Sequence, residues 1–238
     1  MDDRDPFSTM RFPSPARPLL GMTVLLVEDS RYASEAMRLL CMRSGARIRR
    51  ADCLRSARRH LQVYRPSILI VDMGLPDGSG ADLIAEAHGA TPRISTILGI
   101  SADDTTHPLC EAAGGDGFLI KPLHSLAFFQ QEILRHIPQD LQPVGLHQMQ
   151  DELIHPDTVA YRDDLAHVAE LLDAGIDEKV IAYVTQFLDG VAALAGDTAL
   201  QSVNRSLRES CQKGVPLRSD LANLAGVLQE RLNDRVAI

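Results

Sequence analysis

The sequence contains no tryptophan, and only 4% of its 238 residues are aromatic. Its four cysteines are scattered, with no Cys-x-x-Cys pair and no histidine at ligand spacing, which argues against a zinc site or a disulfide framework. No apolar run approaches membrane-spanning length, and the N-terminus is acidic and proline-rich rather than basic and then apolar. These absences predict a cytoplasmic protein without a membrane segment, whose cores are built from aliphatic residues and alanine.

The net charge of -8 is unevenly distributed along the chain. Residues 1–138 hold 16 Lys and Arg against 16 Asp and Glu, whereas residues 139–238 hold 8 against 16. Nucleic-acid binding needs a basic face that contacts the phosphates. The acidic C-terminal half therefore argues against nucleic-acid binding. A length of 238 residues favours two domains of moderate size.

Short apolar runs alternate with amphipathic stretches as far as residue 138. Residues 1–20, which four prolines interrupt, are predicted to be a disordered tail. The apolar runs predict strands at residues 22–27, 46–51, 68–71, 94–100 and 117–120, with a helix after each. Five repeats of strand and helix predict an α/β fold with a doubly wound, five-stranded parallel sheet.

Polar residues follow four of these strands directly, namely Glu28 and Asp29, Asp72, Ser101, and Lys121. Because the carboxyl ends of parallel strands meet at one edge of a sheet, we expect these side chains to converge in one pocket. Three carboxylates repel one another unless a cation offsets them, and an oxygen-only site suits Mg²⁺. A lysine and a hydroxyl are groups that a transferring phosphoryl needs. Taken singly, each residue has a structural alternative as a turn, cap or solvated residue.

Four segments carry a resemblance to a known family. They read Val-Glu-Asp-Ser at 27–30, Asp-Met-Gly-Leu-Pro-Asp-Gly-Ser-Gly at 72–80, Ile-Ser-Ala at 100–102 and Phe-Leu-Ile-Lys-Pro at 118–122. In this order, at strand ends, they resemble the signature segments of the response-regulator receiver domain, over residues 21–138. The resemblance implies the sheet order 2-1-3-4-5 that a chemotaxis member of the family shows.

The resemblance also implies a role for each site residue. Asp72 would be the phosphoacceptor, taking a phosphoryl group from the phosphohistidine of a histidine kinase or a histidine phosphotransfer protein. Ser101 and Lys121 would bind that group, Phe118 would be the switch aromatic, and Pro122 would follow a cis peptide bond. Mg²⁺ would be held by three carboxylates and one backbone carbonyl, those of Glu28, Asp29, Asp72 and Gly74.

One segment departs from the family pattern. The stretch between Ser101 and Phe118 is a residue or two shorter than usual and contains Thr105-Thr106-His107-Pro108, which is poor material for a helix interior. We therefore expect the fourth helix of the domain to be short or irregular. Relatives form an activation face with this helix and use that face in dimers, so the departure from the family pattern falls on that face.

The C-terminal half resembles no family that we recognise. Residues 139–156 read as a linker, and residues 157–238 are predicted to be all-α, with four amphipathic helices that form either an antiparallel bundle or part of a homodimer interface. This half has neither a basic recognition helix nor a recognisable set of catalytic residues. We therefore expect it to act by protein–protein contact, and one hypothesis is that it modulates a phosphorelay.

Two alternatives to this interpretation come from other classes. The protein would be a transcriptional regulator if the C-terminal half were an atypical DNA-binding domain. It would be an enzyme if the C-terminal bundle had phosphotransferase or phosphatase activity, and His167, which lies in a predicted helix, is the candidate phosphotransfer residue. No Lys-Gly pair follows His167, so a structural or surface role is favoured. Apart from accepting its own phosphoryl group, the protein is not predicted to be an enzyme.

Overall fold

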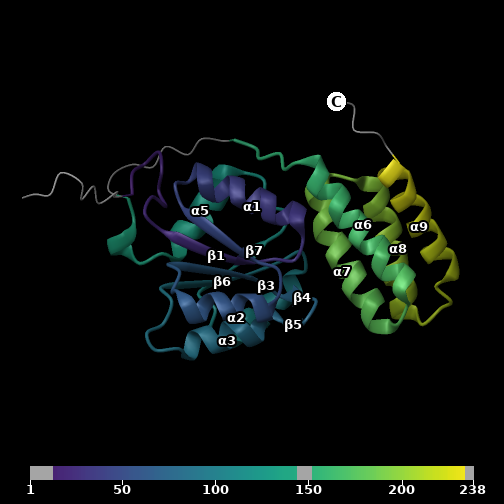
Figure 1. Cartoon of the computed structure of the whole chain (residues 1–238), viewed down its shortest axis with the longest axis horizontal. Coiled ribbons are helices and arrows are strands. Elements are labelled where there is room, and N and C mark those ends of the chain that lie inside the picture. The colour runs from purple at the N-terminus through teal and green to yellow at the C-terminus, as the bar shows by residue number, and fades with distance from the viewer. Residues whose placement is uncertain (1–12, 144–151, 234–238) are drawn as a thin grey trace, which may run out of the picture.

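The computed structural model describes residues 13–143 and 152–233, and in it a sheet domain and a helical bundle lie side by side (Figure 1). The sheet has five parallel strands in the order β2-β1-β3-β6-β7. They are β1 (Thr23–Val27), β2 (Arg47–Ala51), β3 (Ile68–Asp72), β6 (Thr96–Ser101) and β7 (Gly117–Ile120). The predicted doubly wound sheet of order 2-1-3-4-5 is therefore confirmed.

Helices cover both faces of this sheet (Figure 1). One face packs against α1 (Arg31–Arg43) and α5 (Leu126–His136), and the other against α2 (Leu54–Val63), α3 (Gly80–Gly89) and α4 (His107–Ala112). Every residue of β3 and β6 is buried, which explains why their sequences show no apolar–polar alternation. Helix α4 has six residues and follows a 3₁₀ turn at Asp104–Thr106, so the fourth helix is as short as the sequence indicates.

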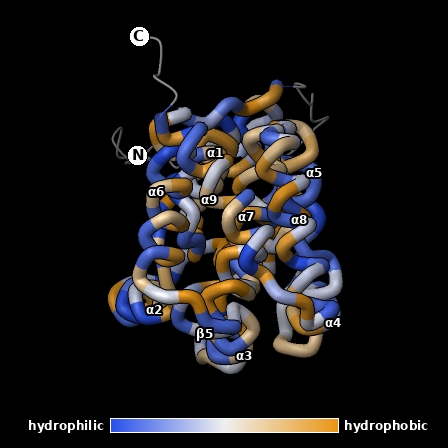
Figure 2. Tube along the Cα trace, turned by 90° about the vertical axis from the view of Figure 1, so that its right-hand side faces the viewer, coloured by the Kyte–Doolittle hydropathy of each residue, from blue (hydrophilic) through white to orange (hydrophobic). Residues whose placement is uncertain are grey.

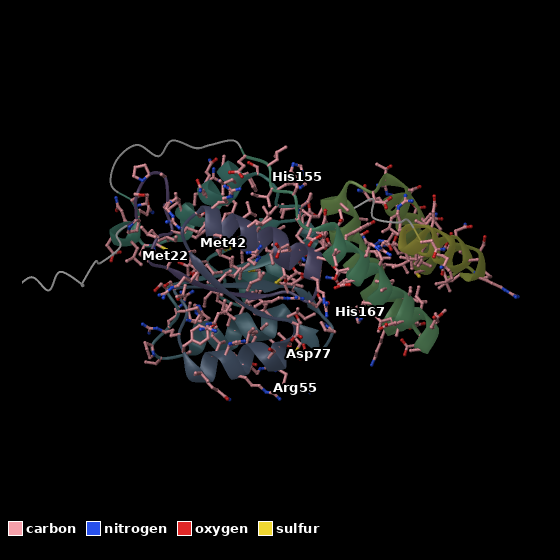
Figure 3. All side chains as sticks on the ribbon, turned by 45° about the horizontal axis from the view of Figure 1, so that its top comes forward. Met22, Met42, Arg55, Asp77, His155 and His167 are labelled. Carbon is pink, nitrogen blue, oxygen red and sulfur yellow. The ribbon has the colours of Figure 1, made fainter. Side chains whose placement is uncertain are left out.

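A small antiparallel hairpin, β4 (Gly74–Leu75) and β5 (Gly78–Ser79), follows β3 and was not predicted. Asp77 in its turn accepts hydrogen bonds from the backbone N–H groups of Leu54 (2.8 Å) and Arg55 (3.0 Å) and so caps α2 (Figure 3). A side chain at Gly80 would collide with the backbone carbonyl of Asp72, so this position needs glycine. The loop that follows Asp72 is thus held tightly against the sheet.

The ends of the sheet domain extend beyond the predicted limits. Leu19 is fully buried in the core, and its N–H donates to the carbonyl of Ser44 at 2.9 Å, so the predicted tail is too long at its C-terminal end. An apolar residue among prolines has no periodicity that would reveal this packing. Residues 1–12 lie outside the described residues. At the other end, Ile154 from the predicted linker is buried in the same core and donates to the carbonyl of His124 at 2.8 Å.

The second unit is helical, as predicted, over its described residues 157–233. Its helices are α6 (Thr158–Ala174), α7 (Glu178–Ala195), α8 (Thr198–Lys213) and α9 (Arg218–Asn233). They surround a separate aliphatic core, and Figure 2 shows that each carries both hydrophobic and hydrophilic stretches. Each of α6, α7 and α8 begins at an aspartate whose carboxylate accepts a backbone N–H of the first turn. Within residues 13–143 and 152–233, no helix is long and apolar enough to cross a bilayer.

Asp197 joins three helices of the bundle. As the N-cap of α8 it accepts from the N–H of Leu200 at 3.0 Å, and it also accepts from the Tyr161 hydroxyl at 2.8 Å and from Arg231 Nε at 2.7 Å. Burial opposes its ionisation, but the Arg231 guanidinium and the other donors outweigh that effect and lower the pKa of Asp197 to about 2. The folded bundle therefore favours the ionised carboxylate.

We expect Asp197→Asn to lower the unfolding free energy by about 2 kcal/mol near about pH 7, because an amide caps α8 but cannot pair with Arg231. Since the pKa is lower in the folded state, the stabilisation is present above about pH 4 and is lost as the pH falls toward about 2. Urea unfolding followed by circular dichroism across this range measures both effects. Asp177→Asn, at the exposed cap of α7, is the matched control, and equal losses in the two variants would contradict the assignment.

Candidate functional site

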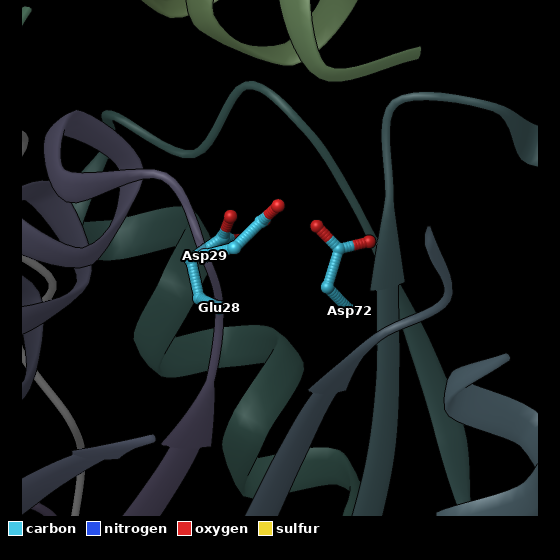
Figure 4. Close-up of side chains that lie close together, drawn as sticks. All are labelled: Glu28, Asp29 and Asp72. Atoms are coloured by element: carbon cyan, nitrogen blue, oxygen red, sulfur yellow. The ribbon is translucent and has the colours of Figure 1, made fainter. Parts of the chain in front are cut away.

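Three carboxylates lie together at the carboxyl ends of β1 and β3. Glu28 and Asp29 follow β1 directly, and Asp72 is the last residue of β3. The two strands are adjacent and parallel, with Val27 opposite Val71, so their ends present these side chains to the same space. One oxygen from each of the three carboxylates lies within 4.8 Å of the others (Figure 4). Glu28 and Asp72 are buried.

Lys121 brings a positive charge into this cluster. Its Nζ lies 2.6 Å from Glu28 Oε2 and 2.6 Å from Asp72 Oδ2. Burial alone would lower the pKa of Lys121, but the charges of Asp72 and Glu28 outweigh that effect and raise it. The residue follows β7, where its N–H donates to the carbonyl of Ser101 at 2.8 Å, and its peptide bond to Pro122 is cis. The ammonium is therefore held between two carboxylates in a charged state.

One lysine does not offset three carboxylates. Burial raises the pKa of Glu28 to about 8, although Lys121 partly opposes this. Burial and the charge of Asp72 raise the pKa of Asp29 to about 6, against the hydrogen bond that Asp29 accepts from Tyr183. The site thus has more negative than positive charge, and it offers carboxylate oxygens beside the Gly74 backbone, whose N–H donates to Asp72 Oδ1 at 3.0 Å. This donor set fits Mg²⁺, a hard cation that prefers oxygen ligands.

The remaining site residues predicted from the sequence are divided between two places. Ser101, the last residue of β6, is buried and lines the same small cavity as the carboxylates, Gly74 and Lys121. Its Oγ accepts from the N–H of Asp103 at 3.1 Å. Phe118 does not line this cavity. Its half-buried ring stacks on His107 of α4, with ring centroids 4.9 Å apart.

A doubly wound α/β domain with a carboxylate cluster and a lysine at the carboxyl ends of its strands defines the receiver class of signalling domains. Residues 24–131 match the family model described as the response regulator receiver domain. This part of the chain is a receiver domain of two-component response regulators.

The curated relatives are named as transcriptional regulators. The chain is 36% identical over 108 residues to the transcriptional regulatory protein CitB of Klebsiella pneumoniae, covering 44% of this chain and 46% of that protein. It is 30% identical over 105 residues to the virulence transcriptional regulatory protein PhoP of Salmonella typhimurium, covering 43% and 46%. The match therefore spans less than half the length of either relative. A putative response regulator from Chloroflexus aurantiacus matches in structure with a TM-score of 0.43 and 25% identity, covering 48% of this chain and 92% of that one.

Helix α7 of the bundle lies over the receiver site, which the sequence did not reveal. Gln186, Phe187, Gly190 and Val191 line the cavity opposite the carboxylates, and Figure 4 shows a bundle helix above the three carboxylate side chains. The Tyr183 hydroxyl donates to Asp29 Oδ2 at 2.5 Å. Burial and the charge of Asp29 raise the pKa of Tyr183, so this hydroxyl stays protonated.

Helix α6 makes the second contact with the receiver domain. Asp164 is buried, and its carboxylate accepts from Ser30 Oγ at 2.7 Å and from the backbone N–H groups of Arg31 at 2.8 Å and Tyr32 at 3.0 Å. These donors form the first turn of α1, where the helix dipole favours an anion. Burial raises the pKa of Asp164, although the hydrogen bonds oppose it. The bundle thus caps a receiver helix that begins beside the site.

His167, the residue considered for phosphotransfer, lies exposed on α6 (Figure 3). Its ring centroid is 6.1 Å from that of Phe187, and it does not line the cavity that contains Asp72. Gln186 is one of the α7 residues that line that cavity. Phosphotransfer through His167 stays a hypothesis.

Proposed function

We propose that this protein is a two-component response regulator that accepts a phosphoryl group on Asp72 from the phosphohistidine of a kinase or phosphotransfer protein. The observation that carries the proposal is the Asp72 carboxylate, buried at 2.6 Å from Lys121 and grouped with Glu28 and Asp29 at the carboxyl edge of the sheet. A carboxylate held in this way is a nucleophile with its charge compensation already in place.

The residues divide the work of the transfer. An oxygen of Asp72 attacks phosphorus, the O–P bond forms as the N–P bond breaks, and the donor imidazole leaves neutral when its other nitrogen carries a proton. Lys121 offsets charge on the phosphoryl oxygens, and Ser101 Oγ–H donates to one of them. When bound by Glu28, Asp29, Asp72 and the Gly74 carbonyl, Mg²⁺ would supply further positive charge at these oxygens.

We expect Asp72→Asn to abolish phosphorylation, with a fall of at least about a hundredfold in the labelled fraction, because an amide is not a nucleophile. The measurement is incubation of the full chain with acetyl phosphate and Mg²⁺, followed by phosphate-affinity electrophoresis. Asp82→Asn, an exposed aspartate on α3, is the matched control and should label like the wild type. Undiminished labelling of Asp72→Asn would show that the phosphoacceptor lies elsewhere.

The bundle is proposed to act by protein–protein contact and not by catalysis. Its acidic character and its docking on the receiver site support this role. Affinity capture with the wild type and with Asp72→Asn should retain different partners, and identical partners would contradict control by phosphorylation.

Transcriptional control is the second candidate, because the curated relatives carry that name. Salt-dependent DNA binding by the full chain would favour it over protein contact.

A further inference from the structure

The cavity above Asp72 is narrow and lies between the two domains of the protein. It has a volume of about 20 Å³ and is bounded by receiver residues on one side and by α7 on the other. This space holds about one water molecule. A phosphoryl group with three oxygens needs more room, so it cannot be attached to Asp72 while α7 stays in this position.

The direction of attack leads to the same conclusion. In phosphoryl transfer the entering and leaving atoms lie roughly in line through phosphorus. A donor nitrogen must therefore approach from beyond the strand end, opposite the Asp72 oxygen. Beyond the strand ends lies α7, whose Gln186 carboxamide lines the cavity and lies so close to Gly74 that a methyl group on Gly74 would overlap it. A carboxamide cannot carry a transferable phosphoryl group. Helix α7 therefore lies where a phosphodonor would have to approach, but it cannot act as a phosphodonor.

The fit of α7 on the site depends on particular residues. A Cβ at Gly190 would lie 3.5 Å from Lys121 Cδ, so an alanine would just fit and a larger side chain would not. Glycine inside a helix costs about 1 kcal/mol relative to alanine, and here the close approach to Lys121 explains its presence. Tyr183 meanwhile donates a hydrogen bond to Asp29 Oδ2, on one of the three carboxylates that could hold a cation. Docking of α7 therefore competes for both the phosphoryl position and the metal ligands.

We infer that the bundle is a built-in competitor of the phosphodonor, in which α7 covers Asp72 and must leave before the phosphoryl group is transferred. The inference rests on the proposed role of Asp72 as phosphoacceptor. Because the coupling between two binding events is reciprocal, a phosphoryl group and Mg²⁺ on the receiver weaken docking as much as docking weakens them. Phosphorylation thus releases α7 and changes what the bundle can contact.

Gly190→Leu in the full chain tests this inference. The leucine would collide with Lys121 in the docked state, yet it would face solvent in the released bundle and favour the helix. We expect labelling by acetyl phosphate with Mg²⁺ to be at least about tenfold faster than in the wild type. Gly226→Leu, at an open position on α9, is the matched control and should label at the wild-type rate. Circular dichroism checks that both variants keep their helix content.

Tyr183→Phe gives a second readout that does not depend on phosphorylation. It keeps the ring and removes the hydroxyl that occupies Asp29, so calorimetric titration should show Mg²⁺ binding several-fold more tightly. In the wild type, Mg²⁺ with beryllofluoride should also increase the radius of gyration measured by small-angle X-ray scattering.

The outcomes separate this inference from the proposed function. Equal labelling rates in Gly190→Leu and the wild type, with Asp72→Asn unlabelled, would overturn the competition and leave the phosphoacceptor in place. Unchanged Mg²⁺ affinity in Tyr183→Phe, or beryllofluoride binding without expansion, would also overturn it. Labelling of Asp72→Asn, or absence of label on every variant, would overturn the proposed function.

Discussion

In Lys121→Met, the unfolding free energy in magnesium-free buffer should fall by about 3–5 kcal/mol, because removing one partner of a buried ion pair leaves the other charge uncompensated. Lys121 Nζ contacts both Glu28 and Asp72 at 2.6 Å, and methionine has a similar length without the charge. The two carboxylates would then remain buried as like charges or take up protons at a cost.

The conditions of the experiment distinguish this effect from lost packing. Urea unfolding followed by circular dichroism is measured with a chelator and with excess Mg²⁺, which should restore part of the loss by supplying another cation. Lys179→Met, at an exposed position on α7, is the matched control and should change the unfolding free energy little. A loss that Mg²⁺ leaves unchanged would contradict the charge argument.

The pH dependence of this loss has a defined sign. The pKa of Glu28 in the folded protein is raised to about 8, above its ordinary value, so the folded state binds the proton more tightly than the unfolded state. A carboxyl of this kind destabilises the fold as the pH rises through that value. Without Lys121 the effect should be stronger, so the variant should lose more stability at about pH 8 than at about pH 5.

The sheet and its site could be predicted from the sequence because each strand end is marked locally. The run Ile68–Val71 has no polar residue, which indicates burial on both faces, and Asp72 ends it. The N-caps Ser30 and Ser79 mark where the next helices begin. Parallel topology then brings the strand ends together without further information from the sequence.

The docking of the bundle could not be predicted in the same way. Helix α7 buries one set of residues in the bundle core, while Gln186 and Gly190 line the receiver cavity and the Tyr183 hydroxyl contacts Asp29. A hydrophobic stripe shows that a helix face is buried, but it does not identify the surface that covers a second, more polar face. The glycine at 190 was the available signal, since an unexplained glycine within a helix often marks a close approach.

Asp163 and Asp164 illustrate the same limit. They are consecutive acidic residues on α6 and are indistinguishable by composition, yet Asp164 is buried against α1 and Asp163 is exposed. The rotation of α6 about its axis decides which of the two aspartates contacts α1. That helix belongs to a domain more than a hundred residues away in sequence. Long-range docking geometry of this kind is not encoded in a local pattern.

Asp164→Ala should release the bundle from the receiver domain. The substitution removes the carboxylate that accepts three hydrogen bonds at the start of α1. The N–H groups of Arg31 and Tyr32 then lose their acceptor. A loss of about 3 kcal/mol in docking free energy would shift the docked-to-released ratio by about a hundredfold. Alanine is a good helix former and Asp164 faces away from the bundle core, so α6 itself should persist.

Amide hydrogen exchange at Arg31 and Tyr32 measures this release most directly, because Asp164 accepts from both N–H groups. Both amides should lose protection in Asp164→Ala, and the radius of gyration should rise. Asp163→Ala is the matched control: it removes the same charge one residue earlier, from an exposed pair with Arg31 at 2.7 Å, and should cost less than about 1 kcal/mol. If both variants exchanged alike, the buried carboxylate would not be what holds the domains together. Release in Asp164→Ala alone would identify one buried aspartate on α6 as the anchor that keeps α7 over Asp72.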